Sequence, residues 1–288
     1  DSFAITRVNT LNELDNVPSI AYGYNLFFFN SSTKKITLKI VDGSNPSDNI
    51  YVLDAINRVT IASPYIEISN MNIQYSYDGI KVTWTNNHPF GESNPDNNAN
   101  YARIINNTIS HVVEQGILSS GKLRVGGVYS SNKISYCGSP FKYSGTTLVY
   151  NNFYHCIYIT GINETVNDNY LEKSYGQELH TWKEGWDSIN PEDRRPKDAK
   201  IFGNTIIGQF VGSGIRNKFY NNKIYTPSDK GASTIAFALY GHSRYEVYNN
   251  TIHGLDGVKF GINNKVDSLI FKNNDVTVES VNGYIIDI

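Results

Sequence analysis

Apolar residues recur five positions apart along most of the chain, and the residues between them are mostly polar. The segment VYNNTI at 247–252 is typical of these apolar-x-x-x-x-apolar hexamers. Nine of them begin at residues 68, 104, 129, 149, 166, 201, 219, 247 and 271. Eight of the nine have asparagine at the fourth position, although asparagine accounts for only 36 of the 288 residues. The chain is therefore an array of structural repeats.

Each hexamer predicts two short β-strands joined by a tight corner. One apolar residue ends the first strand, the other begins the next strand, and both point inward. The corner needs a residue that tolerates the left-handed backbone region, and asparagine is among the best choices after glycine. If the repeats stack about 4.8 Å apart, the corner amides line up and can hydrogen-bond along the stack.

A glycine shortly before apolar residues forms a second recurring signal, here called the glycine–apolar segment. It occurs in DGIKV at 78–82, QGIL at 115–118, CGSPF at 137–141, SGIR at 213–216 and DGVKF at 256–260. Glycine there supplies a further turn before another inward pair. Successive hexamers begin 17–36 residues apart, and the one helical signal is a capping-box pattern at 10–13. These features predict an all-β chain that forms a β-solenoid.

The hexamers and glycine–apolar segments resemble the right-handed parallel β-helix repeats of the pectin lyase-like superfamily. That group includes pectate and alginate lyases, polygalacturonases, phage tailspikes and non-enzymatic surface proteins. The resemblance covers about residues 36–288, and NRVTIASPYIEISNMNI at 57–73 matches an early coil. It implies a right-handed parallel β-helix of about ten coils, preceded by an N-terminal cap at 1–35. The sequence contains neither the polygalacturonase motifs nor the calcium-binding aspartates of pectate lyases, so it matches no catalytic subfamily.

The register of the hexamers also predicts which side chains fill the interior of the coils. The expected interior residues are Ile68, Ile73, Ile104, Ile109, Ile201, Ile206, Phe219, Ile224, Val247, Ile252, Phe271 and Val276. Cys137 and Cys156 are expected in consecutive coils, as buried thiols in preference to a disulfide, since direct stacking leaves their Cβ atoms too far apart.

Composition narrows the class of partner. The net charge is −2 with no basic or acidic block, which argues against nucleic acid and anionic membranes as partners. No apolar run is long enough to span a membrane. The start at Asp1 suggests a mature or trimmed product. The uncharged polar bias and the sequons at Asn30 and Asn163 predict an extracellular protein, either secreted or displayed on a surface or virion.

Function is expected where the chain departs from the repeat, in loop insertions at 83–100 and 172–199. The candidate catalytic residues are Glu178, His180, Glu184, Asp187, Lys218 and Glu246. The candidate substrate-binding residues are Trp84, Trp182, Trp186, Arg216 and Arg244. A uronate lyase needs cations and a base, and a glycoside hydrolase needs two carboxyl groups. Tryptophan faces suit sugar rings in either case.

Outward side chains after the second insertion are expected to form charged columns. Lys200, Lys218 and Glu246 make one column, and Asp198, Arg216 and Arg244 make the next. Two readings stay open, a solvated charge ladder and a groove for an acidic polysaccharide.

Together these features predict an extracellular protein that binds and degrades a polysaccharide or cell-surface glycan, as a lyase or a glycoside hydrolase. A non-catalytic glycan-binding spike or adhesin domain, or a filament subunit, remains open. No metal-ligand spacing or cofactor motif occurs, so neither a metal nor a cofactor is expected. The apolar C-terminal segment VNGYIIDI would leave the last coil uncovered, which predicts a homo-oligomer or a part of a larger chain.

Overall fold

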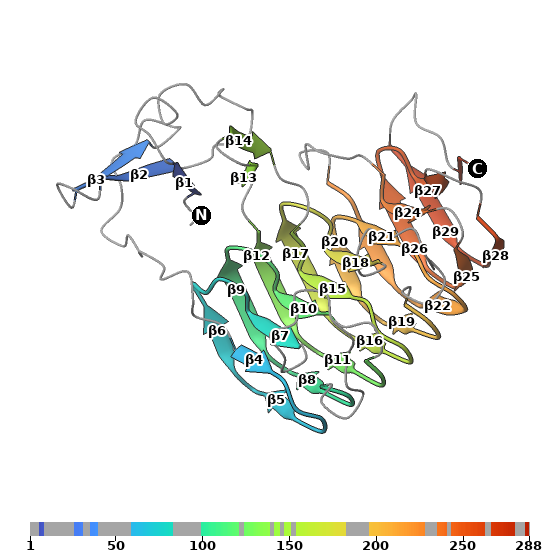
Figure 1. The fold of residues 1–288 in the computed structure, drawn as a ribbon. Coiled ribbons are helices and arrows are strands. Elements are labelled where there is room, and N and C mark those ends of the chain that lie inside the picture. Colours follow the sequence, from blue (N-terminus) through green and yellow to red (C-terminus); the bar gives the residue numbers. More distant parts are fainter. Residues whose placement is uncertain are drawn as a thin grey trace.

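The computed structural model describes the chain in fourteen stretches, and all of its regular elements are strands. The described residues are 6–8, 26–30, 35–39, 59–82, 99–120, 124–138, 141–144, 147–150, 154–182, 196–227, 235–240, 243–262, 266–279 and 286–287. Within them, most strands belong to three parallel sheets that run side by side along a right-handed β-helix (Figure 1).

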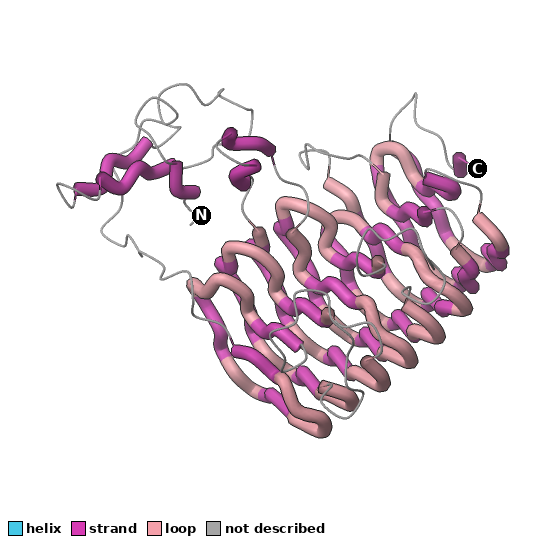
Figure 2. The backbone as a smooth tube through the Cα atoms, viewed as in Figure 1, coloured by secondary structure: helices cyan, strands magenta, loops and turns pink. Residues whose placement is uncertain are grey.

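Each turn of the β-helix contributes one strand to each sheet (Figure 2). Sheet 1 contains β4 (Val59–Ile61), β7 (Ile80–Val82), β10 (Ile117–Ser119), β15 (Ile157–Ile159), β18 (Leu179–Thr181), β21 (Phe210–Gly212), β24 (Phe237–Tyr240), β27 (Val258–Ile262) and β30 (Ile286–Asp287). Sheet 2 contains β5 (Glu67–Ser69), β8 (Arg103–Ile105), β11 (Val128–Ser130), β16 (Thr165–Asn167), β19 (Lys200–Phe202), β22 (Asn217–Tyr220), β25 (Arg244–Tyr248) and β28 (Ser268–Lys272). Sheet 3 contains β6 (Asn72–Gln74), β9 (Thr108–Val112), β12 (Lys133–Cys137), β17 (Tyr170–Ser174), β20 (Thr205–Ile207), β23 (Lys223–Tyr225), β26 (Thr251–Gly254) and β29 (Asp275–Val278).

The remaining strands lie outside the three sheets. β1 (Thr6–Val8), β2 (Leu26–Asn30) and β3 (Lys35–Lys39) form a small mixed sheet. β13 (Phe141–Ser144) and β14 (Thr147–Tyr150) form an antiparallel hairpin. Among the described strands the coils begin at β4, and eight complete coils are followed by β30, the first strand of a ninth.

Eight of the nine predicted hexamers join a strand of sheet 2 to a strand of sheet 3, as expected. The hexamer at 149 is the exception, because it begins within β14 of the hairpin. The glycine–apolar segment at 137–141 likewise leads from β12 into the hairpin. An apolar-x-x-x-x-apolar pattern fits both structures, so the pattern alone could not separate them.

The two central positions of each hexamer have different tasks. The third residue has a left-handed backbone, with φ between 53° and 69°, in all eight confirmed hexamers. The fourth residue builds a buried ladder in which each Nδ2 donates to the Oδ1 of the next coil over 2.8–3.1 Å. The ladder consists of Asn107, Asn132, Asn169, Asn204, Asn222, Asn250 and Asn274. The third residue therefore bends the corner, and the asparagine at the fourth position holds neighbouring coils together.

The interior follows the predicted register. Eight of the twelve expected residues are at most 2 % exposed, and Ile68, Ile73, Phe271 and Val276 in the terminal coils pack half-buried against them. Cys137 and Cys156 are buried free thiols, which confirms the preferred reading.

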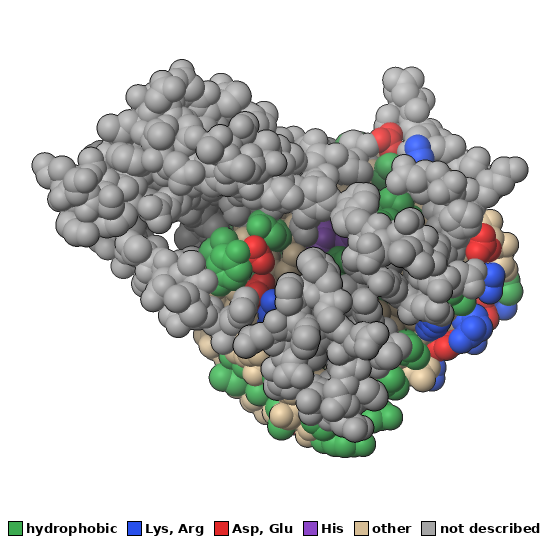
Figure 3. Space-filling model, viewed as in Figure 1, with side chains coloured by type: hydrophobic (Ala, Val, Ile, Leu, Met, Phe, Trp, Pro, Cys, Tyr) green, Lys and Arg blue, Asp and Glu red, His purple; other side chains and the backbone are tan. Residues whose placement is uncertain are grey.

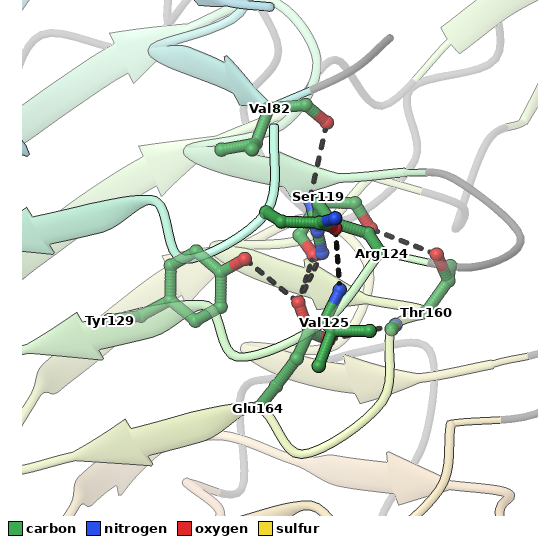
Figure 4. A network of polar contacts seen from close by, with 9 residues as sticks. Val82, Ser119, Arg124, Val125, Tyr129, Thr160 and Glu164 are labelled. Atoms are coloured by element: carbon green, nitrogen blue, oxygen red, sulfur yellow. Dashed lines mark hydrogen bonds and ion pairs between the residues drawn. The ribbon is translucent and has the colours of Figure 1, made fainter. Parts of the chain in front are cut away.

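One ion pair is enclosed within the early coils (Figure 4). The guanidinium of Arg124 donates to Oε1 of Glu164, and both side chains are at most 1 % exposed. The same oxygen accepts hydrogen bonds from Ser119 Oγ over 2.8 Å and from Tyr129 OH over 2.9 Å, and Oε2 accepts from the amide of Gly161 over 2.8 Å. Burial raises the pKa of Tyr129, which therefore remains a donor. Further hydrogen bonds thus satisfy the buried carboxylate, as a buried ion pair requires, whereas Nε of Arg124 has no partner among the described residues.

The second insertion is shorter than the predicted 172–199. Residues 172–174 belong to β17 and residues 179–181 to β18, so both are part of the coil. Residues 183–195, and residues 83–98 of the first insertion, lie outside the described part of the chain.

Candidate functional site

The predicted site residues are divided between two faces of the β-helix. Lys218, Glu246, Arg216 and Arg244 lie on strands or corners of sheet 2. His180 lies in β18 of sheet 1 and Trp182 directly after it. Trp84, Glu184, Trp186 and Asp187 fall outside the described residues. The described candidates therefore lie on two different sheets, whose outer faces point to different sides of the coil.

The charged columns on sheet 2 have the predicted register, since Lys200 pairs with Lys218 and Lys218 with Glu246. Charged side chains gather over β22, β25 and β28 (Figure 3). Their ion pairs are Arg216–Asp198 at 2.6 Å, Lys218–Glu246 at 3.4 Å and Arg244–Asp267 at 3.7 Å. The bond to Asp198 raises the pKa of Arg216. All three pairs are solvent-exposed, and such pairs contribute only about 0–1 kcal/mol each.

An aromatic column runs beside these charges. The ring centroids of Phe202 and Tyr220, and those of Tyr220 and Tyr248, are 5.0 Å apart with nearly parallel planes, and Lys272 lies 5.5 Å from the Tyr248 centroid. The rings therefore stack face to face, and all three side chains are half-buried. The charges pair with each other and the rings stack on each other. This geometry favours the solvated charge ladder over a groove for an acidic polysaccharide.

Glu178 is enclosed and cannot meet a substrate in this structure. It is 0 % exposed, its Oε1 accepts the amide hydrogen of Ser174 over 3.0 Å, and its Oε2 accepts that of Gln209 over 2.6 Å. The carboxylate thus satisfies backbone donors of two coils. Its proposed catalytic role is replaced by a structural one.

The outer face of sheet 1 carries a cluster of rings, here called the ring cluster, consisting of His155, Tyr158, His180, Trp182 and Tyr240. Ring centroids are 4.5 Å apart for His155 and His180, 5.2 Å for Tyr158 and His180, 5.7 Å for His180 and Trp182, and 4.2 Å for Trp182 and Tyr240. Tyr158, Trp182 and Tyr240 are half-buried, whereas both histidines are buried. Burial raises the pKa of Tyr240 and lowers that of His180 to about 3. His180 is therefore neutral near pH 7 and a weak base.

A carboxylate lies at the turn that leads into the same sheet. Oε1 of Glu114 accepts hydrogen bonds from Tyr77 OH over 2.5 Å and from Tyr154 OH over 3.0 Å. Burial, reinforced by the Glu114 charge, raises the pKa of Tyr154. Sequence reasoning missed this group. Tyr77, Glu114 and Tyr154 each precede the first residue of β7, β10 and β15 by three positions, so counting back from those strands would have placed them in one column.

The side of the molecule seen in Figure 3 brings hydrophobic, acidic, basic and histidine side chains close to one another. On such a surface, aromatic side chains can stack on a ring of a ligand, and the polar side chains can donate and accept hydrogen bonds. No group of three or more metal-binding side chains occurs among the residues that the structure describes. In the same part of the chain, no helix is long and apolar enough to cross a membrane.

Comparisons with known proteins find no counterpart, since no protein-family model, no curated protein and no solved structure matches this chain.

Proposed function

We propose that this protein binds an extracellular polysaccharide on the outer face of sheet 1, through the ring cluster and Glu114. The observation that carries the proposal is the cluster itself, in which half-buried rings surround two imidazoles on an outer surface. Half-buried tyrosine and tryptophan offer an apolar face and a polar edge, the combination that suits a sugar ring. The parallel β-helix and its hexamers are consistent with a place in the pectin lyase-like superfamily, which is part of the same proposal.

Binding is better supported than degradation. A lyase base should have a pKa near the working pH, and His180, with its pKa lowered to about 3, is far from that value. A glycoside hydrolase needs two carboxyl groups at the substrate, but Glu178 is enclosed by backbone donors. Among the described carboxylates, Glu114 is the one at this face with hydrogen bonds from two hydroxyls. We therefore propose a glycan-binding module first, and an enzyme that uses Glu114 second.

The test compares three double variants in binding to a panel of neutral and acidic polysaccharides. Trp182→Ala with Tyr240→Ala should weaken binding by about tenfold or more, since each lost aromatic contact contributes about 0.5–1.5 kcal/mol. Tyr220→Ala with Tyr248→Ala removes two stacked rings from sheet 2 and should leave binding unchanged.

The third variant, Arg216→Ala with Arg244→Ala, tests the charged columns. A loss of binding there, with none in the ring-cluster variant, would move the site to sheet 2. Wild-type protein that retains no polysaccharide of the panel would defeat the proposal. Absorbance at 235 nm and release of reducing ends, measured on the same panel, separate a lyase or a hydrolase from a binding module.

A further inference from the structure

A ladder of side chains and amides occupies the corner that leads into sheet 1. The amide of Gln115 donates to Asp78 Oδ1 over 3.3 Å, the amide of His155 to Gln115 Oε1 over 2.7 Å, and the amide of Gln177 to His155 Nδ1 over 3.2 Å. Each side chain therefore accepts the backbone N–H of the residue that occupies the same position in the next coil. His155 is a member of a repeating column and not an isolated histidine.

This column determines where His155 carries its proton. Nδ1 also lies 3.3 Å from the carbonyl oxygen of Gln177, so it could instead donate to that oxygen. The amide of Gln177 would then lose its acceptor, and backbone donors in the body of a protein are nearly always paired. Nδ1 is therefore the acceptor, as Gln115 Oε1 is one coil earlier. The proton of the neutral ring is on Nε2.

The proton on His155 in turn orients His180. His155 Nε2 lies 3.0 Å from His180 Nδ1, so it donates, and His180 Nδ1 accepts. Neutral His180 must then carry its own proton on Nε2. That atom is itself buried and has no hydrogen-bond partner in the described part of the chain, while the residue as a whole is 8 % exposed. A buried donor without an acceptor is unfavourable unless a water, an ion or a ligand completes it.

We infer that His155 is a positioning residue which fixes His180 as a hydrogen-bond donor, and that the ring cluster receives a sugar oxygen at His180 Nε2. This inference rests on the proposed function. Because burial keeps His180 uncharged, the contact selects an acceptor oxygen and needs no negative charge on the sugar. His180 thus acts as a hydrogen-bond donor and not as a catalytic base.

The first experiment reads the tautomers directly in the intact protein. Long-range proton–nitrogen spectra of histidine-labelled protein should show both His155 and His180 protonated on Nε2. Protonation of both rings on Nδ1 would overturn the inference, because His180 Nδ1 would then donate to His155 Nε2 and His180 Nε2 would be an acceptor. His155→Gln keeps an acceptor and a donor, and Gln115 already accepts a backbone amide at the same position of the preceding coil. This variant should therefore leave His180 protonated on Nε2. His155→Leu keeps neither, so the Nδ1-protonated form of His180 should appear.

The second experiment adds cellohexaose, maltohexaose and hexagalacturonate as probes. An oligosaccharide that binds should shift the His180 Nε2–H resonance and slow its exchange with water, and His180→Phe should weaken binding by about tenfold, the loss expected for one hydrogen bond. If binding shifts the ring-cluster signals but not His180, this inference fails and the proposed function stands. If no probe binds, both fail. If hexagalacturonate is the one probe that binds, a negative charge on the sugar is required, and the inference of a neutral contact fails.

Discussion

Two adjacent asparagines should respond to the same substitution with very different losses of stability. Asn221 is exposed and has φ of 55°, whereas Asn222 is 1 % exposed and belongs to the ladder. Asn222 Oδ1 accepts the amide of Asn204 over 3.0 Å and its Nδ2 over 2.9 Å. Asn222 Nδ2 donates to Ile201 O over 3.0 Å and to Asn250 Oδ1 over 3.1 Å. The two positions are neighbours, but only one of them connects three coils.

The expected magnitudes follow from these bonds. Asn222→Gly leaves two buried donors of Asn204 without their acceptor, each at a cost of about 1–3 kcal/mol, so unfolding should become easier by about 2–6 kcal/mol. Asn221→Gly places glycine in the left-handed conformation that glycine adopts readily, against a small entropic cost. Its effect on the free energy of unfolding should stay below about 1 kcal/mol.

Urea unfolding followed by circular dichroism would measure both variants against the wild type at one pH. The difference between the two midpoints is the decisive quantity, since both proteins lose the same atoms from adjacent positions. Equal destabilisation, or a loss below about 1 kcal/mol for Asn222→Gly, would refute the division of tasks between the third and fourth hexamer positions.

Three further predictions concern stability. His180 has a pKa of about 3 in the folded protein and 6.5 in the unfolded chain, so the unfolded chain binds the extra proton and the free energy of unfolding falls as pH drops from 6.5 towards 3. Between pH 6.5 and 5 the loss should be about 2 kcal/mol. The measurement is the dependence of the free energy of unfolding on pH, and this part of it should disappear in His180→Gln. Glu164→Gln removes one charge of the buried pair with Arg124 and should lower the free energy of unfolding by about 3–5 kcal/mol in the same urea assay. As a control, Glu67→Gln in the exposed pair with Arg103 should lower it by less than about 1 kcal/mol. Ile252→Asp buries a charge at a site that is 0 % exposed and should yield no folded protein by circular dichroism; a soluble, cooperatively melting variant would contradict the register.

The coil could be predicted from the sequence because the residues of each hexamer determine the local structure of that hexamer. A left-handed third residue, a ladder asparagine and two inward apolar residues are local requirements, and they recur often enough to outweigh chance. The same reasoning explains the failure at residue 149. A local pattern specifies the spacing of apolar residues but not the partner strand, and β14 pairs with β13 instead of continuing the coil.

The site depended on tertiary structure because its contacts join residues far apart in the sequence. Tyr77, Glu114 and Tyr154 meet across separations of 37 and 40 residues, and the insertions between coils hide their common column. Two carboxylates that look equivalent in sequence also differ in burial. Backbone amides of two coils enclose Glu178, whereas Glu114 is half-buried and accepts from two hydroxyls. Local conformation and periodicity are encoded within each repeat, so the sequence by itself determined the β-helix and its interior. The register between coils decides which polar side chains meet. The hexamers predicted it for sheet 2, but insertions interrupt the repeat before sheet 1, and there only the tertiary structure shows which side chains meet.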